Sequence, residues 1–261
     1  MLNSESLQEK IFQIKDALRI IDIEANKSRL EKTEKLCQLL ISYNSHTNLV
    51  ADPSPEILVE RHILDSLSLL EFWPISGIPM SDNKQNQPVR TIDLGSGAGF
   101  PGLILAIWID SLEMTLADSN GKKTRFLNEC VDALELNERV RVVTDRLENL
   151  GRDPRHRHEY DLVTSRALGH LCLSAELGLP LLARGGVGAF YKTARQAEME
   201  TKALEGMLEA LGAEKPTILK PKIQMGSSEH VIVQIVKRGK GADSFPRNWK
   251  TIKKHLDKLK G

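Results

Sequence analysis

The chain has 261 residues, with 36 Lys and Arg against 35 Asp and Glu, which leaves a formal net charge of +1 at pH 7. This length is enough to bury a full hydrophobic core, as one large domain or as one domain with an appendage. The balanced charge excludes a bulk electrostatic field that attracts nucleic acid, so any RNA binding must depend on local basic patches.

The cysteines and the hydropathy pattern bear on the compartment. Cys37, Cys130 and Cys172 are odd in number, widely spaced and free of CxxC pairing. This favours buried thiols in a reducing compartment over a zinc site or a disulfide framework. Because the first 23 residues carry many charges and no long apolar run follows, we expect a cytoplasmic protein without a membrane segment or a bound metal.

Three helices are predicted before residue 75. Apolar residues recur at helical spacing over residues 7–21, a packing appendage, and again over residues 36–43, before a turn-forming cluster at 44–48. A third helix is expected over residues 55–72, with its apolar residues on one arc and a polar group on the other. That polar group is Arg61, His62 and Asp65, with Arg61 and Asp65 one turn apart. By themselves these three are most simply a solvated face with one weak ion pair.

A glycine-rich junction is the strongest local signal in the chain. The polar run 79–88 is typical of a linker or surface insertion, and the β-branched apolar run 89–94 predicts a buried parallel strand. Three alternating glycines over residues 95–99 end this strand, and helical spacing then resumes with Pro101 in the first turn. Such glycines let a ligand approach N–H groups at the positive end of a helix dipole, which predicts a nucleotide-type cofactor site.

The spacing of these glycines and the acid that follows narrow the type of cofactor. Counted from Gly95, the dinucleotide fingerprint requires its third glycine at position 100, where this chain has Phe100, so the match to a nicotinamide or flavin fold is imperfect. The next predicted strand, residues 112–117, ends in Asp118, which is placed to accept hydrogen bonds from ribose hydroxyls. Asp118 is alternatively a helix N-cap with Ser119, and both roles are compatible.

Three motifs together resemble one known family. They are Asp93-Leu94-Gly95-Ser96-Gly97-Ala98-Gly99-Phe100-Pro101-Gly102, Arg61-His62-Ile63-Leu64-Asp65-Ser66 upstream, and Ser165-Arg166-Ala167 downstream. In this combination, and over residues 36 to 247, the chain resembles the glucose-inhibited-division B family, the guanine-N7 methyltransferases of bacterial small-subunit ribosomal RNA. The resemblance implies an α/β fold of the Rossmann-like class I type, with a mostly parallel seven-stranded sheet, helices on both faces and an N-terminal helical extension. It also implies S-adenosylmethionine as methyl donor and 16S ribosomal RNA or the small ribosomal subunit as partner.

The resemblance also assigns roles to residues. It implies that Arg61 and His62 contact RNA phosphate or the target nucleotide, with Asp65 orienting one of them. For Leu147 it implies a contact with the cofactor's adenine, but a position in the hydrophobic core is equally compatible with this residue. The cofactor-binding residues that it implies are Gly95, Gly97, Gly99, Phe100, Asp118, Leu147, Glu148 and Arg166.

Two basic groups follow Asp118. Cations at 122, 123 and 125 open a predicted helix and oppose its dipole, so RNA phosphate or the cofactor's surroundings is one explanation and surface solubility is the other. Beyond a third strand at 140–143, the run Arg152, Arg155, His156, Arg157 and His158 enters the amino end of a strand at 160–164. Ligands in open α/β sheets bind outside the carboxyl ends of the strands, so this run is interpreted first as a solvated loop and second as a peripheral RNA contact.

The carboxyl ends of the later strands carry two further candidates. Arg166 leaves the strand at 160–164 and presents five donors to a cofactor carboxylate or a phosphate. Lys192 ends a strand at 187–191 and lies on the functional edge. Family members often have Lys-Gly at this turn, whereas this chain has Lys192-Thr193, which puts the geometry of the turn in doubt.

The remaining chain completes the sheet. Helices are predicted over 168–182 and 194–211, and closing strands over 218–220 and 231–236. The tail 237–260 carries nine Lys or Arg against two Asp, so it either grips phosphates or frays in solvent. If the last strand is antiparallel, as in the resembling methyltransferases, this tail starts on the side away from the cofactor.

The chemistry is narrowed by motifs that the sequence lacks. Neither an Asn-Pro-Pro-Tyr cage for an exocyclic amine nor a nucleophilic Pro-Cys pair occurs. Guanine N7 carries an in-plane lone pair that attacks a sulfonium methyl group without losing a proton, so no general base is required. We therefore expect Arg61, His62, Arg166 and Lys192, with Asp65, to position RNA or cofactor.

We divide the chain into an N-terminal helical extension and linker (1–88), a Rossmann-like methyltransferase domain (89–238) and a basic C-terminal tail (239–261), and we expect a monomer. Two rival classes stay open. An NAD(P)-type Rossmann oxidoreductase shares the strand–glycine loop–helix start. A non-catalytic ribosome-binding protein with a relict cofactor fold predicts cofactor binding without methyl transfer.

Overall fold

The computed structural model describes residues 4–74, 87–223 and 229–259. Its helical segments are α1 Ser4–Arg19, α2 Lys27–Asn44, α3 Pro55–Ile57, η1 Leu58–Ile63, α4 Leu64–Leu67, η2 Ser68–Phe72, α5 Gly102–Trp108, α6 Gly121–Ala133, α7 Leu147–Leu150, α8 Leu171–Gly178, η3 Leu179–Leu181, α9 Ala194–Leu211 and α10 Trp249–Lys258. Its strands are β1 Val89–Leu94, β2 Leu112–Asp118, β3 Val140–Thr144, β4 Tyr160–Arg166, β5 Leu182–Thr193, β6 Thr217–Leu219 and β7 His230–Val236. Most of the predicted linker 79–88 lies outside the described residues.

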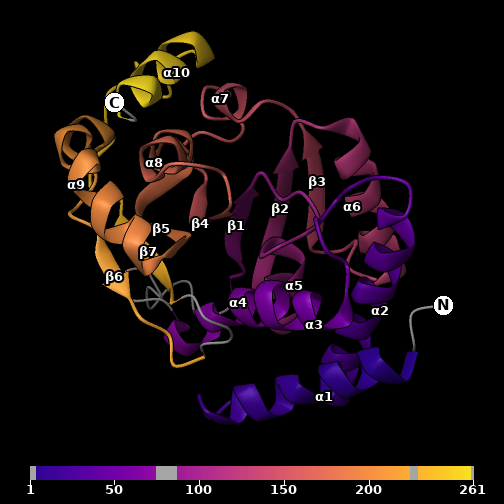
Figure 1. Cartoon of the computed structure of the whole chain (residues 1–261). Helices are drawn as coiled ribbons and strands as arrows, with labels where there is room; N and C mark the ends of the chain where they lie inside the picture. The colour runs from indigo at the N-terminus through magenta and orange to yellow at the C-terminus, as the bar shows by residue number, and fades with distance from the viewer. Residues whose placement is uncertain (1–3, 75–86, 224–228, 260–261) are drawn as a thin grey trace.

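A single seven-stranded sheet organises the molecule, in the order β3-β2-β1-β4-β5-β7-β6 (Figure 1). Strands β1 to β5 are paired in parallel, and β7 runs antiparallel to both of its neighbours. Parallel strands covered on both faces read as continuous apolar runs, and β1 and β4 are buried along nearly their whole length. The mostly parallel, Rossmann-like sheet implied by the family resemblance is confirmed.

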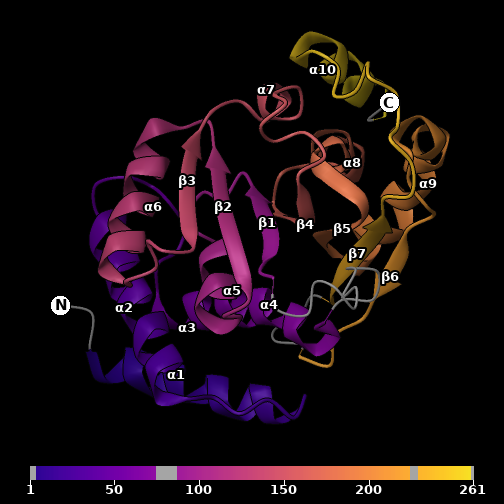
Figure 2. The same cartoon turned by 180° about the vertical axis from the view of Figure 1, so that it is seen from behind.

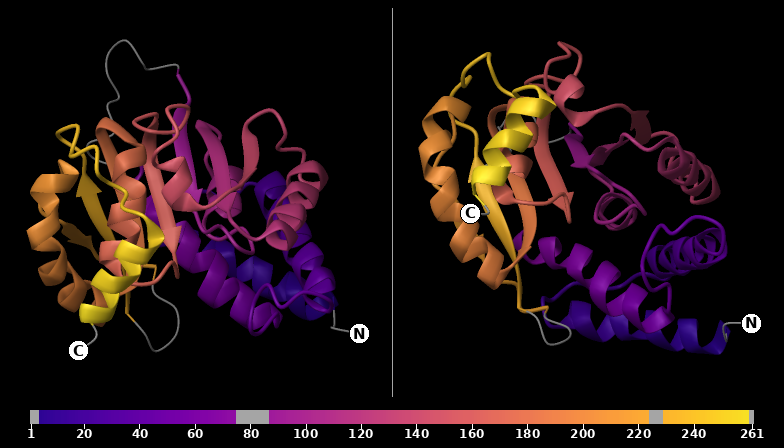
Figure 3. Two further views of the ribbon diagram at one scale, coloured as in Figure 1. Left: turned by 90° about the horizontal axis from the view of Figure 1, so that it is seen from above. Right: turned by 45° about the horizontal axis from the view of Figure 1, so that its top comes forward.

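Two hydrophobic clusters fill the space on the two faces of the sheet. One joins buried residues of α1, α2 and the 55–72 segment to those of α5 and α6, and the other joins α7, α8, α9 and α10. Figures 1 and 3 place the first helices and the last helices on opposite sides of the molecule. The N-terminal helices therefore share a core with the sheet, and the division at residue 88 stays a prediction.

The predicted third helix is present over residues 55–72, but its hydrogen-bonding pattern changes along its length. Six residues of it, Leu58–Ile63, are π-helical, between the short helices α3 and α4. π-helical turns are rare and recur at functional sites, and this one carries Arg61 and His62.

The boundaries of two elements differ from the prediction. The helix expected from residue 168 begins at Leu171, because Ala167 and Gly169 have φ of 57° and 105°, which no α-helix accommodates. The strand expected from residue 187 begins at Leu182, because Gly185 donates its N–H to Lys237 O at 2.6 Å and Gly186 O accepts from the Lys237 N–H at 2.9 Å. Gly185 and Gly186 therefore belong to the strand, whose predicted start at residue 187 is wrong.

The turn after Lys192, whose geometry the sequence left in doubt, is the start of α9. Thr193 has φ of −76° and ψ of 154°, and it caps α9 through a reciprocal capping box with Gln196. Because this backbone conformation is extended, it does not require a glycine at position 193.

The basic tail is ordered as α10, so the interpretation as a frayed end is wrong for residues 249–258. Ile252 is buried at 1% exposure and packs into the second hydrophobic cluster, which holds the helix on the body.

All three cysteines are free and buried, as predicted. Burial raises the pKa of Cys37 to about 12 and that of Cys172 to about 11, which keeps both thiols protonated. Over the described residues, no helix combines the length and apolar character needed to cross a bilayer, and no cluster of three or more His, Cys, Asp or Glu side chains is arranged to hold a metal ion.

Candidate active site

The glycine loop connects β1 to α5 at the carboxyl end of the central strands. Gly95, Gly97 and Gly99 all have positive φ, at 67°, 56° and 93°. The N–H groups of Gly95 and Ser96 donate to Ala117 O at 2.8 and 3.1 Å, which ties the loop to β2. A Cβ atom at Gly99 would lie 2.5 Å from Leu103 Cδ1 and 3.2 Å from Leu103 Cβ, so at a φ of 93° any other residue is strained there.

Gly102 serves the packing of α5 on the sheet. A Cβ atom there would lie 2.4 Å from Leu116 Cδ2, so its absence lets the helix approach β2. Gly97, Gly99 and Gly102 together satisfy the G-x-G-x-x-G spacing that a count from Gly95 misses. The glycine spacing therefore does not separate a dinucleotide from another nucleotide cofactor, which corrects the sequence-based argument.

Asp93 lies in β1, just before the glycine loop, and fixes the loop through hydrogen bonds on its buried side. Its carboxylate is fully buried and accepts from Thr164 Oγ1 at 2.8 Å and from the Gly102 N–H at 3.2 Å. Burial raises its pKa to about 6 despite these hydrogen bonds, which favour the charged form. Asp93 therefore joins β1 to β4 and to the start of α5.

Asp118, the last residue of β2, also fixes the glycine loop. One of its carboxylate oxygens accepts from the Gly97 N–H at 3.0 Å and the other from the Asn120 N–H at 2.9 Å. The N-cap of α6 is Asn120, whose side chain accepts from the Lys122 and Lys123 N–H groups, so the alternative of a cap by Asp118 with Ser119 is wrong. A carboxylate has about four lone-pair sites, so Asp118 keeps acceptor capacity for hydroxyl groups.

One of the three cations that open α6 lies over the glycine loop. A Cβ atom built at Gly97 would lie 3.9 Å from Lys123 Nζ. Lys122 and Arg125 are exposed on the same helix. Lys123 therefore belongs to the surroundings of the loop, and the other two face solvent.

Arg166, at the end of β4, joins the sheet to the 55–72 segment. Its guanidinium donates to Asp65 Oδ2 at 3.2 Å and to Arg61 O at 2.8 Å, and it lies 2.6 Å from His62 Nδ1. The structure thus brings four predicted site residues together, but only the main chain of Arg61 takes part. The side chain of Arg61 is exposed.

His62 is neutral in this arrangement. A guanidinium has donors only, so His62 Nδ1 accepts from Arg166 and Nε2 carries the proton. Burial, and then the charge of Arg166, lower the pKa of His62 to about 4. Its ring stacks on Phe100, with centroids 5.0 Å apart and planes at 13°, and the Arg166 guanidinium lies 5.4 Å from the same Phe100 ring.

Asp65 does not orient Arg61 or His62 as expected. It is buried at 9% exposure on the side of the helix that faces the sheet, where it binds Arg166 and lies 3.1 Å from His230 Nδ1. This hydrogen bond to Asp65 raises the pKa of His230. His230 was missed from the sequence; its only signal is its place opening the last strand, opposite Thr193.

Lys192 lies at the expected edge but is bound within the protein. It is 9% exposed, its ammonium lies 2.8 Å from Glu200 Oε2, and it donates to Gly169 O. Glu200 also accepts from the Leu171 N–H at 2.6 Å. Lys192 and Glu200 therefore fix the loop between β4 and α8 to α9.

Leu147 and Glu148 open α7, directly after β3. Leu147 is 8% exposed and packs in the second hydrophobic cluster, so the core interpretation holds for its side chain. The Glu148 carboxylate lies 3.6 Å from the Arg146 guanidinium. Because β3 pairs with β2 up to Asp118, these residues lie at the same edge as the glycine loop.

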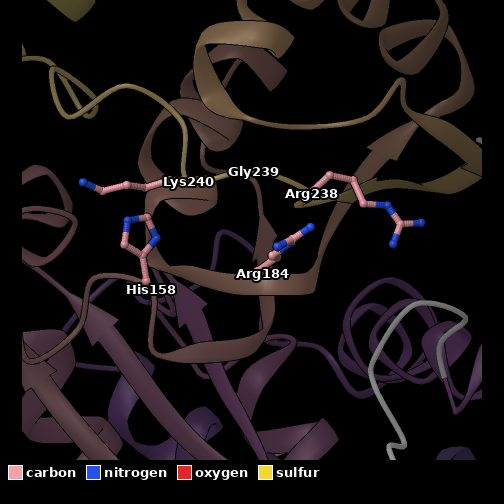
Figure 4. A pocket seen from close by; sticks show the side chains of 5 residues that line it. All are labelled: His158, Arg184, Arg238, Gly239 and Lys240. Carbon is pink, nitrogen blue, oxygen red and sulfur yellow. The ribbon is translucent and has the colours of Figure 1, made fainter.

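The basic run at 152–158 has a structural use that the sequence did not indicate. Arg152 donates to Pro246 O at 3.1 Å, and Arg157 donates to Phe245 O at 2.7 Å. His158 lines a cavity of about 530 Å³ with Arg184, Arg238 and Lys240, at the amino ends of β4 and β5 (Figure 4). This cavity lies at the edge of the sheet opposite the glycine loop.

The family model of rRNA small subunit methyltransferase G (GidB) matches residues 29–226. The ribosomal RNA small subunit methyltransferase G of Lachnoclostridium phytofermentans is 36% identical over 233 residues, covering 88% of this chain and 90% of that protein. The protein of the same name from Chloroflexus aggregans is 36% identical over 208 residues, covering 80% and 82%.

Two solved structures align with part of this chain at low sequence identity. A putative S-adenosyl-L-methionine-dependent methyltransferase from Methanococcus maripaludis has a TM-score of 0.44 at 18% identity, covering 67% of this chain and 91% of that one. A precorrin-6y C5,15-methyltransferase from Geobacter metallireducens has a TM-score of 0.45 at 16% identity, covering 74% and 92%.

Proposed function

The chain belongs to the rRNA small subunit methyltransferase G family, and from this premise we propose that it transfers a methyl group from S-adenosylmethionine to N7 of a guanine in 16S ribosomal RNA. The observation that carries this proposal is the family match over residues 29–226, which spans the glycine loop, Asp118 and Arg166. Family membership also decides against an NAD(P)-dependent oxidoreductase. We place the activity in the cytoplasm, in a monomer.

The residues at the carboxyl edge fit the proposed cofactor. Around Gly97 the nearest heavy atom to a built Cβ is Gly95 O at 3.6 Å, an ordinary van der Waals separation, so no side chain crowds the backbone there. The N–H groups of Gly95, Ser96, Gly97 and Gly99 already donate within the protein, so we assign the loop backbone of 95–100 to packing against the cofactor. We assign the remaining lone pairs of Asp118 to its ribose and the backbone at Leu147 and Glu148 to its adenine. When bound, S-adenosylmethionine supplies an electrophilic methyl group on a sulfonium.

Arg166 keeps capacity for the cofactor carboxylate. A guanidinium has five N–H donors, and the bonds to Asp65, the Arg61 carbonyl and His62 use three of them. The Asp65 side of this network fixes the guanidinium plane, so its remaining donors point in a defined direction. The proposed role of Arg166 is therefore to hold the cofactor and the 55–72 segment in one arrangement.

The chemistry requires alignment rather than proton transfer. Guanine N7 has a lone pair that is free at neutral pH, and well-oriented reactants gain roughly 7–11 kcal/mol from proximity. A His62 pKa of about 4 leaves the imidazole neutral, so it neither repels the sulfonium nor titrates near pH 7. We assign His62 and Phe100 to the wall of the acceptor site and the exposed Arg61 to RNA phosphate. Lys192 is assigned to holding the loop after β4.

The test is methyl transfer to the proposed substrate. Purified protein and labelled S-adenosylmethionine are incubated with small subunits from a strain that lacks this enzyme, and the RNA is then cleaved by borohydride and aniline, which break the chain at N7-methylguanine. One labelled site that cleaves is the expected result. Label that resists cleavage contradicts N7 as the acceptor, and bound S-adenosylhomocysteine without any label indicates the non-catalytic alternative.

A further inference from the structure

Helix α10 presents an unpaired basic face. Lys250, Lys253, Lys254 and Lys258 are exposed, and within the described part of the chain none of them has a carboxylate within 4 Å. Asp257 is the one acid on this helix. The helix lies beyond residues 29–226, so it is outside the part of the chain that the family model covers.

The position of α10 is fixed by buried polar contacts. The backbone N–H and Nε of Arg247 donate to Glu176 Oε1 at 2.9 and 2.8 Å, and Glu176 is 1% exposed. Arg152 and Arg157 hold the carbonyls of residues 246 and 245. A Cβ atom at Gly151 would lie 2.7 Å from Pro246 Cγ, so the packing there is close as well. The lysines are therefore carried on a rigid element.

This element lies beside the proposed adenine end of the cofactor site. Figures 1 and 2 show α10 next to α7 in both views. The Arg146 guanidinium lies 5.8 Å from the centre of the Trp249 ring, and Trp249 is 41% exposed. Arg146 directly precedes Leu147 and Glu148. The basic face thus continues through an exposed aromatic ring to the edge that carries the glycine loop.

We propose that α10, with Trp249 and Arg146, is a docking surface for the substrate RNA, in which the lysines contact phosphates and the Trp249 ring stacks on an unpaired base. This proposal rests on the proposed function, because it takes ribosomal RNA as the substrate. A rigid row of cations beside an exposed aromatic ring is the combination that binds single-stranded nucleic acid. The overall charge of +1 makes such a local surface necessary.

A membrane is the other partner that a basic amphipathic helix can serve, and the packing disfavours it. An interfacial helix inserts its apolar face among lipids. In α10 that face is occupied, since Ile252 is buried and Leu256 packs against the second hydrophobic cluster. The charged face and the exposed Trp249 ring are left for a partner.

The first test removes the charge. Lys250→Gln, Lys253→Gln and Lys254→Gln are combined and compared with Arg19→Gln, Lys27→Gln and Lys35→Gln, an equal charge change on exposed residues of α1 and α2. Binding to small-subunit RNA is measured against salt. Since each phosphate contact contributes about 0.7–0.9 to the slope of log affinity on log salt, we expect the α10 variant to lose about two to three slope units and the control none.

The second test addresses the ring. Trp249→Ala is expected to raise the KM for small subunits about tenfold with kcat unchanged, as for one lost base stack, and Trp249→Phe to restore most of it. The affinity for S-adenosylhomocysteine stays at the wild-type value in every variant, which shows that the fold and the cofactor site are intact.

Two results overturn the proposal. The first is an α10 lysine variant whose salt slope and KM equal those of the control variant. The second is an α10 lysine variant that loses the binding of the wild type to anionic phospholipid vesicles but binds RNA as the wild type does. Failure of the proposed function is a separate outcome. It is a wild-type protein that transfers no methyl group, whereas the salt dependence of RNA binding tests the docking surface without any transfer.

Discussion

The glycine loop and the Arg166 cluster lie at the same edge of the sheet but are built in opposite ways. Backbone conformation and tight packing determine the loop, whose positive φ values leave no choice of residue at Gly99. Charged side chains determine the cluster, where Arg166, Asp65 and His62 meet across 101 to 104 positions of sequence. A local site therefore tolerates few residues at each position, whereas a long-range site depends on partners that must be kept together.

Arg166→Ala breaks the long-range site most severely. It leaves Asp65, whose side chain is 7% exposed, without its guanidinium, and removing one member of a buried ion pair costs about 3–5 kcal/mol of unfolding free energy. Urea unfolding measures this loss. In the same variant the pKa of His62 is expected to rise from about 4 toward 6.5, which an NMR titration follows.

Arg166→Lys is the matched control for this variant. It keeps the positive charge but loses the planar fork, so we expect an intermediate loss of stability. A stability equal to that of Arg166→Ala would mean that the geometry of the fork, and not the charge, holds the cluster.

Gly99→Ala tests the local site. Its φ of 93° strains any L residue, and the added methyl group meets Leu103, so we expect a loss of about 2–4 kcal/mol in urea unfolding, with weaker binding of S-adenosylhomocysteine. Gly97→Ala shares the positive φ but has space around it, and its loss is expected to be about 1–2 kcal/mol. Equal losses in the two variants would contradict the role of packing.

Asp93 lies between the two kinds of site, because it supports the loop with a side chain. Asp93→Ala leaves the Thr164 hydroxyl and the Gly102 N–H buried without an acceptor, for a loss of about 1–3 kcal/mol. Asp93→Asn still accepts from Gly102 and donates to the Thr164 hydroxyl, so its unfolding free energy at pH 8 is expected to be close to that of the wild type. A large loss in Asp93→Asn would mean that the buried charge itself is required.

The two histidines that contact Arg166 and Asp65 give effects that depend on pH. The folded pKa of His62 is about 4, so as pH falls from 6.5 the unfolded chain gains a proton first and stability declines. His230 has a raised folded pKa, so its contribution is complete below pH 6.5 and is lost as pH rises through that raised value. From pH 8 to pH 5 the contribution of His62 falls over about 1.5 pH units below 6.5, so the unfolding free energy at pH 8 minus that at pH 5 is expected to be about 2 kcal/mol smaller in His62→Gln than in the wild type.

The pH dependence of the methyl-transfer rate also tests whether His62 is neutral. His62→Gln is expected to leave the pH profile of methyl transfer flat near neutrality, because a group that is already neutral provides no ionisation there. An ionisation near pH 6.5 that is present in the wild type and lost in this variant would contradict a positioning role.

The sequence predicts the loop better than it predicts the cluster, for a physical reason. The strand, the glycines and the first turn of α5 are neighbours in the chain, so their pattern alone indicates a cofactor loop. The partners of Arg166 and Lys192 depend on which strands pair. His230 reaches Asp65 only because β7 lies beside β5, and Glu200 reaches Lys192 only because α9 folds back over the strand. Neither contact has a periodicity that a sequence reveals.

Boundaries were missed where single backbone conformations decide them. The positive φ of Ala167 delays α8, and an alanine in a helical pattern gives no warning of it. The roles of Arg152 and Arg157 were missed because their partners are main-chain carbonyls 94 and 88 positions away. A run of basic residues in the sequence indicates positive charge, but it does not reveal that their guanidinium groups donate hydrogen bonds to main-chain carbonyl oxygens.

The clamp between Arg247 and Glu176 has a practical consequence for shortened versions of the chain. Glu176 is 1% exposed in α8, so a protein that ends before Arg247 keeps a carboxylate in its interior with no cation to neutralise it. We expect such a protein to be degraded, so that its activity is lost through low abundance and not through weaker RNA binding. A nonsense mutation at codon 247 should therefore behave as a loss-of-protein allele, although the glycine loop and every proposed cofactor contact are still encoded.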